Sequence, residues 1–349
     1  MFANILTCCL ESYKIKEKEV RQVKIKVPDY FVKFRCIADR CKDSCCIGWE
    51  IDIDDITKAK YQALNTEIGH EIVEKTKHGC FPLQENGRCA FLDENGLCRI
   101  ISSHGDGYLC DICREHPRYY GVGKDGIEGG LGLGCEEAAR IILGLCSLPK
   151  ITEIERDVHY EDGDPLAEVS EEFRSLLSDG IFTSDAEDLI SRYTAYAAVA
   201  DEVAFEASAM QKSVKIPKVT HVRIEKEESE RMLCDYLDLL SECEYMSEGW
   251  QGLIAAAKSV DTDRLIEGTN SAKGLLYYFT HRYVREGVED MSLGQRILFA
   301  LLSTLAIIAI SAVTDTEEPI VRATVLFSKN IEYSTDNVDM ILDNLSSFL

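Results

Sequence analysis

The spacing of the cysteines is the feature of this sequence that most constrains its fold. Ten of the fifteen cysteines lie between residues 36 and 135. Thiolates bind soft metal ions and iron–sulfur clusters. We therefore predict that one or more metal centres organise the N-terminal part of the chain. The candidate ligands are Cys36, Cys41, Cys45, Cys46, Cys89, Cys98, Cys110, Cys113 and Cys135.

Two other uses of cysteine fit this set less well. A disulfide framework is typical of short secreted chains, whereas this chain has 349 residues, an odd number of cysteines and no signal-peptide pattern at its start. We therefore expect a cytoplasmic protein. Cysteine also serves as a small buried hydrophobe. That interpretation suits Cys146, Cys234 and Cys243, which lie among apolar residues in segments with helical periodicity.

The sequence predicts a mainly α fold in three parts. Residues 1–22 form an N-terminal extension, and residues 23–149 form a cysteine-rich metal-binding module with short strands. Residues 150–349 form an α-helical domain. Its acidic segment 155–168 is interpreted as a linker. The helices are expected at about 168–178, 184–211, 224–246, 261–286, 291–313 and 334–347.

Two glycine- and acid-rich segments of the module are interpreted structurally. Residues 49–54 alternate apolar and acidic side chains and predict a strand, followed by a helix cap at Asp55. Residues 121–126 match the dinucleotide-binding glycine spacing by letter, but Asp125-Gly126 is a hairpin turn signal and no helix begins there. We therefore predict a hairpin over 118–134, with Cys135 at the start of the helix that follows.

Charge and hydropathy limit the partners. The net charge of −23 disfavours nucleic acid, since phosphate binding needs a basic surface, and it suits a basic partner. The longest apolar run, residues 297–313, is slightly too short to span a bilayer and contains hydroxyl side chains. We interpret this run as a buried core helix and expect no membrane partner.

Spacing alone leaves the metal open. Cys110-x2-Cys113 and Cys41-x3-Cys45 are plausible ligand pairs on tight turns, and the adjacent Cys45 and Cys46 are expected to serve separate roles. A zinc ribbon would need a second CxxC pair. A radical S-adenosylmethionine signature would need cysteine at position 48, where the chain has Gly48.

Several segments together resemble the flagellin lysine-N-methylase family and the wider group of cysteine domains that chelate zinc or iron. They are FRCIADRCKDSCCIGWEID at 34–52, Cys89 with Phe91-Leu92, and residues 96–100, 109–118 and 134–140. The resemblance implies S-adenosylmethionine-dependent methylation of lysine side chains on a flagellin-like protein. It also implies a [4Fe-4S] cluster held by cysteines, with zinc as the alternative. His116 and Glu136 depart from the family pattern without removing a candidate ligand.

Charged side chains near the cysteines are candidates for binding the cosubstrate. A guanidinium group could bind the cosubstrate carboxylate or reduce the negative charge of a cluster, and the candidates are Arg114, Arg118 and Arg140. A structural ion pair with a nearby acidic side chain is the simpler role. No catalytic residue is assigned. The rival hypothesis is a non-catalytic zinc- or iron-binding interaction module, or a redox sensor.

Overall fold

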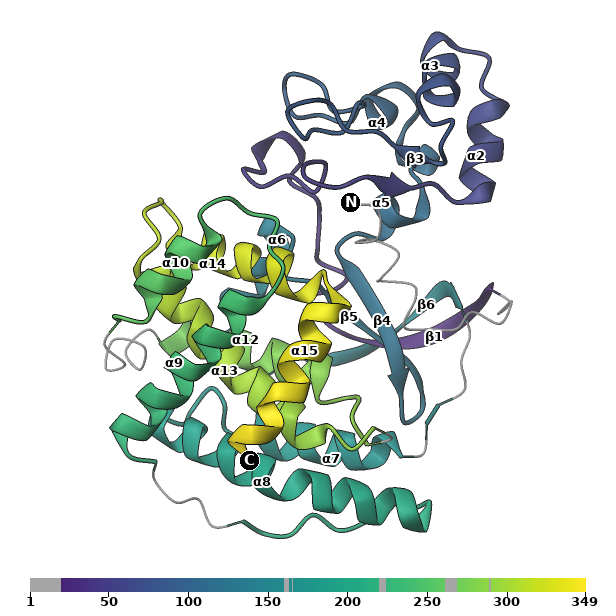
Figure 1. The fold of residues 1–349 in the computed structure, drawn as a ribbon. Helices are drawn as coiled ribbons and strands as arrows, with labels where there is room; N and C mark the ends of the chain where they lie inside the picture. The colour runs from purple at the N-terminus through teal and green to yellow at the C-terminus, as the bar shows by residue number, and fades with distance from the viewer. Residues whose placement is uncertain (1–19, 160–162, 165, 220–223, 261–268, 289) are drawn as a thin grey trace.

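The computed structural model describes residues 20–159, 163–164, 166–219, 224–260, 269–288 and 290–349. These residues form two hydrophobic cores. The smaller core belongs to a small lobe made of residues 36–113, and the larger core combines a sheet with the helices (Figure 1). The mainly α class is confirmed.

A mixed four-stranded sheet lies beside the helices (Figure 1). Its strands follow the order β4-β5-β1-β6. β1 pairs in parallel with β5 and antiparallel with β6. The predicted hairpin is confirmed as β4 and β5, and its turn places Gly126 at φ +124°, a conformation that favours glycine. The strands are β1 Val20–Pro28, β4 Arg118–Gly123, β5 Gly126–Leu131 and β6 Ile151–His159.

β6 corrects the expectation for the segment after residue 150. Part of the predicted acidic linker belongs to a nine-residue strand that pairs with β1 along its whole length, with Ile25 opposite Ile154. The acidic side chains of β6 face lysines of β1, as in the Lys24–Glu153 ion pair of 3.9 Å. Residues beyond 150 therefore complete the sheet that contains β1. The domain boundary expected between residues 149 and 150 stays a prediction.

The small lobe consists of short elements around a compact core. Its core contains Ile51, Tyr61, Ile72 and Phe91 with other apolar side chains. Asp54, one residue before the expected cap, accepts a hydrogen bond of 2.8 Å from the Thr57 N–H at the start of α2. The expected strand at 49–54 is limited to β2. The elements are η1 Ala38–Arg40, β2 Ile51–Asp52, α2 Asp55–Gln62, α3 Glu67–Lys75, β3 Cys80–Phe81, α4 Arg99–His104, η2 Asp106–Tyr108 and α5 Asp111–Glu115.

The remaining helices surround α13 (Leu293–Ala312) (Figure 1). α13 is the one described helix long and apolar enough to cross a membrane. Of its most apolar stretch, 83% is buried in the protein, as expected for a core helix. The helix predictions are confirmed, although the first part of the helix expected at 261–286, residues 261–268, lies outside the described residues. Most of the expected N-terminal extension, residues 1–19, also lies outside them. α10 and α14 were not expected. The other helices are α6 Glu136–Leu143, α7 Ala167–Ser178, α8 Ala186–Met210, α9 Lys226–Glu242, α10 Trp250–Ala257, α12 Thr269–Tyr283, α14 Pro319–Phe327, the π-helical η3 Ser328–Glu332, α15 Thr335–Leu345 and η4 Ser346–Phe348.

Candidate metal centre

Five of the predicted ligands gather at the core of the small lobe, and we call them the small-lobe thiols: Cys46, Cys89, Cys98, Cys110 and Cys113. Cys89 and Cys110 are buried in the small core, and the other three pack against it. Backbone pairing positions them, since the Cys89 N–H donates to the Cys46 carbonyl at 2.8 Å. Cys98 and Cys110 occupy the positions just before α4 and α5.

The other four predicted ligands lie where the small lobe meets the larger core, and we call them the junction thiols: Cys36, Cys41, Cys45 and Cys135. Three come from the loop before β2. Cys135 directly precedes α6, as predicted, and packs against the larger core. The Cys135 thiol interacts electrostatically with Cys41 and Cys45, and the Cys36 thiol interacts with Cys45 and Cys135.

The two groups meet at the peptide that joins Cys45 to Cys46. The thiols of these two residues hydrogen-bond to each other, and the Cys113 thiol interacts electrostatically with both. The segments 36–46 and 110–113 are therefore neighbours, and which of their thiols hold a metal stays a prediction. Cys80 is the remaining cysteine between residues 36 and 135; its thiol lies 3.7 Å from a Glu50 carboxylate oxygen.

Burial raises the pKa of these thiols, whereas individual hydrogen bonds raise it at some of them and lower it at others. Burial raises the pKa of Cys89 to about 11 and that of Cys41 to about 12. The hydrogen bond from Cys45 lowers the pKa of Cys46 to about 7. Burial also raises the pKa of Cys135, although the backbone amides of Ala138 and Glu137 oppose that shift. Amide donors of this kind stabilise thiolates once a metal has displaced their protons.

The donor type at this site, cysteine thiols, is the one that iron–sulfur clusters use. Among the described residues, no three histidine, cysteine or acidic side chains converge closely enough to hold a metal ion. A single zinc ion would need its thiolates about 4 Å apart, because each lies about 2.3 Å from the metal. A cluster binds each thiolate through a different iron and accepts wider spacing. Cys89, Cys98 and Cys135 are partly shielded from solvent and have backbone amide donors beside their sulfurs.

Glu136 anchors the loop that carries the junction thiols. Its buried carboxylate accepts hydrogen bonds from the backbone N–H groups of Lys42 at 2.6 Å and Asp43 at 3.0 Å. The Cys41 thiol donates to the same oxygen at 3.3 Å, and Arg140 pairs with the other oxygen. The first residue of α6 therefore fixes the backbone between Cys41 and Cys45.

A second anchor joins the same loop to the C-terminal helices. The Asp43 carboxylate pairs with Arg322 of α14 and with Lys329 of η3, whose Nζ lies 2.5 Å away. The Lys329 ammonium also lies 5.1 Å from the ring centroid of Trp49, and this ring contacts Tyr333 edge to face at 5.2 Å. The small lobe is thus held against the helices by charge pairs and aromatic contacts.

The predicted cosubstrate-binding arginines have different surroundings. Arg114 pairs with Asp111 and Glu115, and Arg140 pairs with Glu136, Glu137 and Glu318, so both make the structural ion pairs considered from the sequence. The Arg118 guanidinium instead lies over the rings of Phe31 and Phe34, at 5.4 and 5.5 Å. Its buried Nε has no hydrogen-bond partner among the described residues.

His116 and the three cysteines that were expected to be buried, Cys146, Cys234 and Cys243, have different surroundings. Burial, with the charges of Lys329 and Arg118, lowers the pKa of His116 to about 4, so this imidazole is neutral at neutral pH. Cys146 was expected to be buried, but it is exposed after the end of α6. Cys243 is buried as expected, whereas Cys234 is half-buried.

Sequence reasoning missed a buried polar group between β4 and α12. The Arg282 guanidinium lies 4.6 Å from the ring centroid of Tyr119 and 3.2 Å from Glu332, whose side chain is completely buried. The hydroxyls of Tyr278 and Tyr283 donate to the same Glu332 oxygen at 2.7 and 2.9 Å. The sequence signal was the polar and aromatic run YYFTHRY, inside a helix that must be buried.

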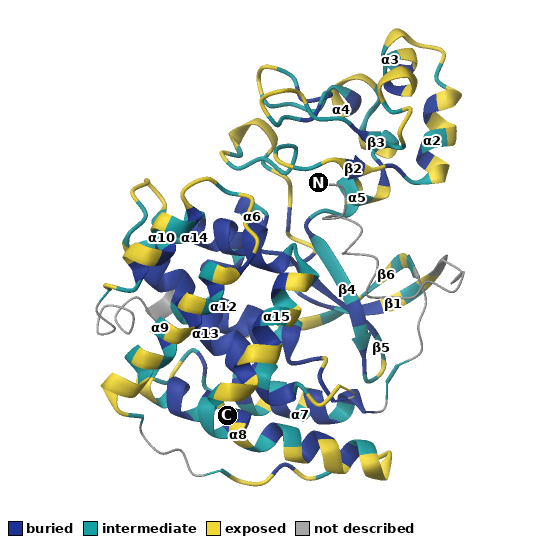
Figure 2. Cartoon of the chain, in the orientation of Figure 1, coloured by how far each residue is buried: buried dark blue, intermediate teal, exposed yellow. Residues whose placement is uncertain are grey.

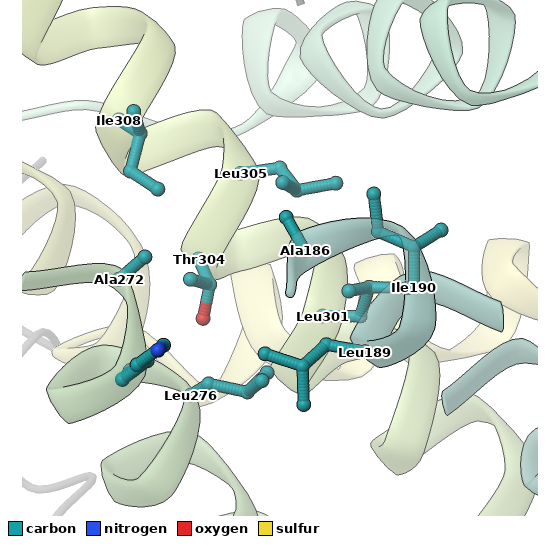
Figure 3. Close-up of a pocket in the computed structure, with 10 residues that line it drawn as sticks. Ala186, Leu189, Ile190, Ala272, Leu276, Leu301, Thr304, Leu305 and Ile308 are labelled. Atoms are coloured by element: carbon teal, nitrogen blue, oxygen red, sulfur yellow. The ribbon is translucent and has the colours of Figure 1, made fainter. Parts of the chain in front are cut away.

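Two cavities among the described residues lie away from the small-lobe and junction thiols. An apolar cavity of about 40 Å³ is bounded by α8, α12 and α13 and lined by residues such as Leu189, Leu276 and Leu301 (Figure 3). A second cavity, of about 270 Å³, lies between α9 and the end of α10, beside Cys234. Ligand pockets span about 300–1,000 Å³, so neither cavity has the size expected of a cosubstrate site.

Part of the chain is similar in sequence to curated lysine-N-methylases and to a flagellar biosynthetic protein. It is 31% identical over 134 residues to a lysine-N-methylase of Salmonella typhimurium and 30% identical over 134 residues to one of Salmonella choleraesuis. Each match covers 36% of this chain and 33% of the relative, so the chain spans a third of these relatives. A flagellar biosynthetic protein FliU of Salmonella muenchen is 30% identical over 134 residues, which cover 79% of that relative and 36% of this chain. No family model and no solved structure matches the chain.

Proposed function

The chain belongs to the flagellin lysine-N-methylase family, and we propose that it transfers methyl groups from S-adenosylmethionine to lysine side chains of a flagellin-like protein in the cytoplasm. The observation that carries this proposal is the gathering of nine thiols from four separate segments. Those segments are the ones that resemble the lysine-N-methylases.

The proposed reaction is a nucleophilic displacement. The lysine nitrogen forms a bond to the methyl carbon while the carbon–sulfur bond of the sulfonium breaks, which leaves a neutral thioether. Lysine is protonated at neutral pH, with a pKa of about 10.4, so the ε-ammonium must first lose a proton to become a nucleophile. The net charge of −23 favours approach of a lysine-bearing substrate.

We propose further that thiolates of the cysteine module hold an iron–sulfur cluster. The small-lobe thiols Cys46, Cys89, Cys98, Cys110 and Cys113 include the four ligands that a cluster needs, shielded by the small core. When bound, such a cluster supplies iron sites that bind ligands or carry an electron. The protein contributes the hydrophobic shield and the amide donors, which tune such a centre.

The test uses anaerobically purified protein, S-adenosylmethionine and purified flagellin. We expect broad visible absorption from iron and sulfide, together with methylated lysines detected by mass spectrometry of flagellin peptides. Cys113→Ser should lose both signals. Cys80→Ser, a matched substitution outside the proposed ligand set, should keep both.

Colourless protein that contains zinc and leaves flagellin unmethylated would contradict this function and favour a metal-stabilised interaction module. Reversible reduction of an iron centre, without turnover under the same conditions, would favour a redox sensor. Wild-type activity in Cys113→Ser would contradict a role for the small-lobe thiols.

A further inference from the structure

β6 forms one edge of the four-stranded sheet (Figure 1). It pairs with β1 along all nine of its residues, and among the described residues no strand pairs with its other edge. A free strand edge presents backbone N–H and C=O groups with which a second extended segment can pair. Proline, lysine and bulges commonly prevent such pairing, but β6 has no proline or lysine and its register with β1 is continuous. Its backbone is therefore open to an added strand.

The side chains of β6 make this edge acidic on one face. Glu153, Glu155 and Asp157 alternate along the strand and are exposed. In the pairing with β1, Lys26 lies opposite Glu153 and Lys24 lies opposite Glu155. The charged atoms of Lys24 and Glu153 are 3.9 Å apart, and both side chains stay mostly exposed, so this pair leaves the carboxylate accessible. β1 thus shows the kind of strand that β6 accepts, one with lysines at alternate positions.

Charge selects the partner of the free edge. A second copy of β6, aligned with its acidic face on the same side, would place carboxylates opposite carboxylates, and like charges directly opposite one another destabilise a strand pair. An acidic segment of another protein is disfavoured for the same reason. A segment that carries lysines would place ammonium groups beside the acids, as β1 does on the paired edge. The edge therefore discriminates against self-association and in favour of a basic extended segment.

β6 lies beside the small lobe. The Arg156 guanidinium, in the middle of β6, donates to a Glu115 carboxylate oxygen at 3.2 Å. Glu115 is the last residue of α5 and follows Cys113 by two positions in the chain. The hydroxyl of Tyr120, in β4, donates to the same Glu115 oxygen at 2.8 Å. A segment that pairs with β6 would therefore pass close to the lobe that carries the small-lobe thiols.

We propose that the free edge of β6 binds an extended, lysine-bearing segment of the protein substrate, which adds to the sheet as a further strand. Backbone hydrogen bonds would hold the segment, and Glu153, Glu155 and Asp157 would contact lysines at alternate positions. This inference rests on the proposed function for the identity of the protein that carries the segment. The edge docks the segment and takes no part in the methyl transfer itself.

The test uses a fluorescently labelled peptide as long as β6, in which lysine alternates with threonine, and measures its anisotropy with the full-length protein. We expect saturable binding that weakens about 3- to 10-fold in Glu155→Gln/Asp157→Gln, since each opposite-charge pair contributes modestly. Glu202→Gln/Glu206→Gln, which neutralises two exposed acids of α8, is the matched control and should bind as the wild type does. A peptide with glutamate in place of lysine should not bind.

A second measurement needs only the wild-type protein and separates strand addition from simple charge attraction. An added edge strand pairs through the backbone N–H groups of every second residue. Backbone N-methylation of one alternate set of peptide residues should therefore abolish binding, whereas methylation of the other set should preserve it. Equal effects of the two sets, no saturable binding of the unmethylated peptide, or unchanged affinity in Glu155→Gln/Asp157→Gln would overturn docking at β6.

These measurements separate the docking edge from the proposed function. Peptide binding is read without turnover, so protein that binds the peptide through β6 and does not methylate flagellin would contradict the proposed function alone. In active protein, Glu155→Gln/Asp157→Gln should raise KM for flagellin and leave kcat unchanged, because the edge only docks the substrate. An unchanged KM would overturn the docking edge and leave the methylation intact.

Discussion

Buried charges at the boundary between sheet and helices are held by specific partners. Glu128 of β5 is 7% exposed, and Arg174 of α7 donates to both of its oxygens, at 2.8 and 3.2 Å. Burial would raise the pKa of Glu128, but the Arg174 charge and hydrogen bonds outweigh it and lower the pKa from 4.5 to about 2. The ion pair therefore stabilises the fold when Glu128 is ionised.

This depressed pKa predicts a pH dependence of stability. The contribution of Glu128 is fully present above its unfolded pKa of about 4.5 and is lost as pH falls toward about 2. We compare urea unfolding of wild type and Glu128→Gln. The stability advantage of the wild type should shrink by about 2 kcal/mol between about pH 6 and about pH 3. An advantage that stays constant over this range would show that Glu128 titrates normally in the folded protein.

A second residue-scale prediction concerns the buried Arg282–Glu332 pair. Arg282→Met removes the cation and leaves the fully buried Glu332 charge with the hydroxyls of Tyr278 and Tyr283. Loss of one partner of a buried pair costs about 3–5 kcal/mol. We expect urea unfolding to show a loss of that size in Arg282→Met and a smaller one in Arg282→Met/Glu332→Gln. Equal losses in the two variants would mean that Glu332 is not charged in the folded protein.

At the scale of elements, the loop before β2 is held from outside the small lobe. Asp43→Asn weakens its pairing with Arg322 and Lys329, so we expect faster hydrogen exchange of the backbone amides over residues 36–46. α2 and α3 should be unaffected. Asp55→Asn, which changes an exposed acid of the same lobe, is the control. Unchanged exchange in Asp43→Asn would show that Glu136 alone fixes the loop.

Periodicity predicted the long helices because each buries one continuous face, whereas β6 was missed. Ile151, Ile154 and Val158 are separated by charged residues, and the segment becomes a strand only because the lysine-rich β1 lies beside it. The cysteine spacing indicated candidate ligands, and their role stays a prediction. It could not separate the small-lobe thiols from the junction thiols, because that division depends on which thiols pack against the small core in the folded chain.

At the scale of the whole molecule, the two cores differ greatly in size. The larger core extends over the sheet and most helices, whereas the small core contains ten buried residues, two of them cysteines. Figure 2 shows continuous buried faces on the central helices and mostly intermediate or exposed residues in the small lobe. Small cores usually need a disulfide or a metal to be stable. The cysteines of this lobe are free thiols in the structure, and the metal proposed above would supply that stabilisation.

Removal of metal should therefore unfold the small lobe selectively. Metal binding ties together thiolates that repel one another without it, so its binding free energy becomes folding free energy. We predict that chelator-treated protein, or Cys110→Ser/Cys113→Ser, is cleaved by a protease within the small lobe, residues 36–113. A C-terminal fragment that contains α7 to α15 should resist, because its core is built mainly from residues other than the predicted ligands. Cys80→Ser should give the wild-type pattern. If the stripped protein resists cleavage as well as the metal-loaded protein, the small core is stable by itself, and the gathered cysteines are not structural ligands.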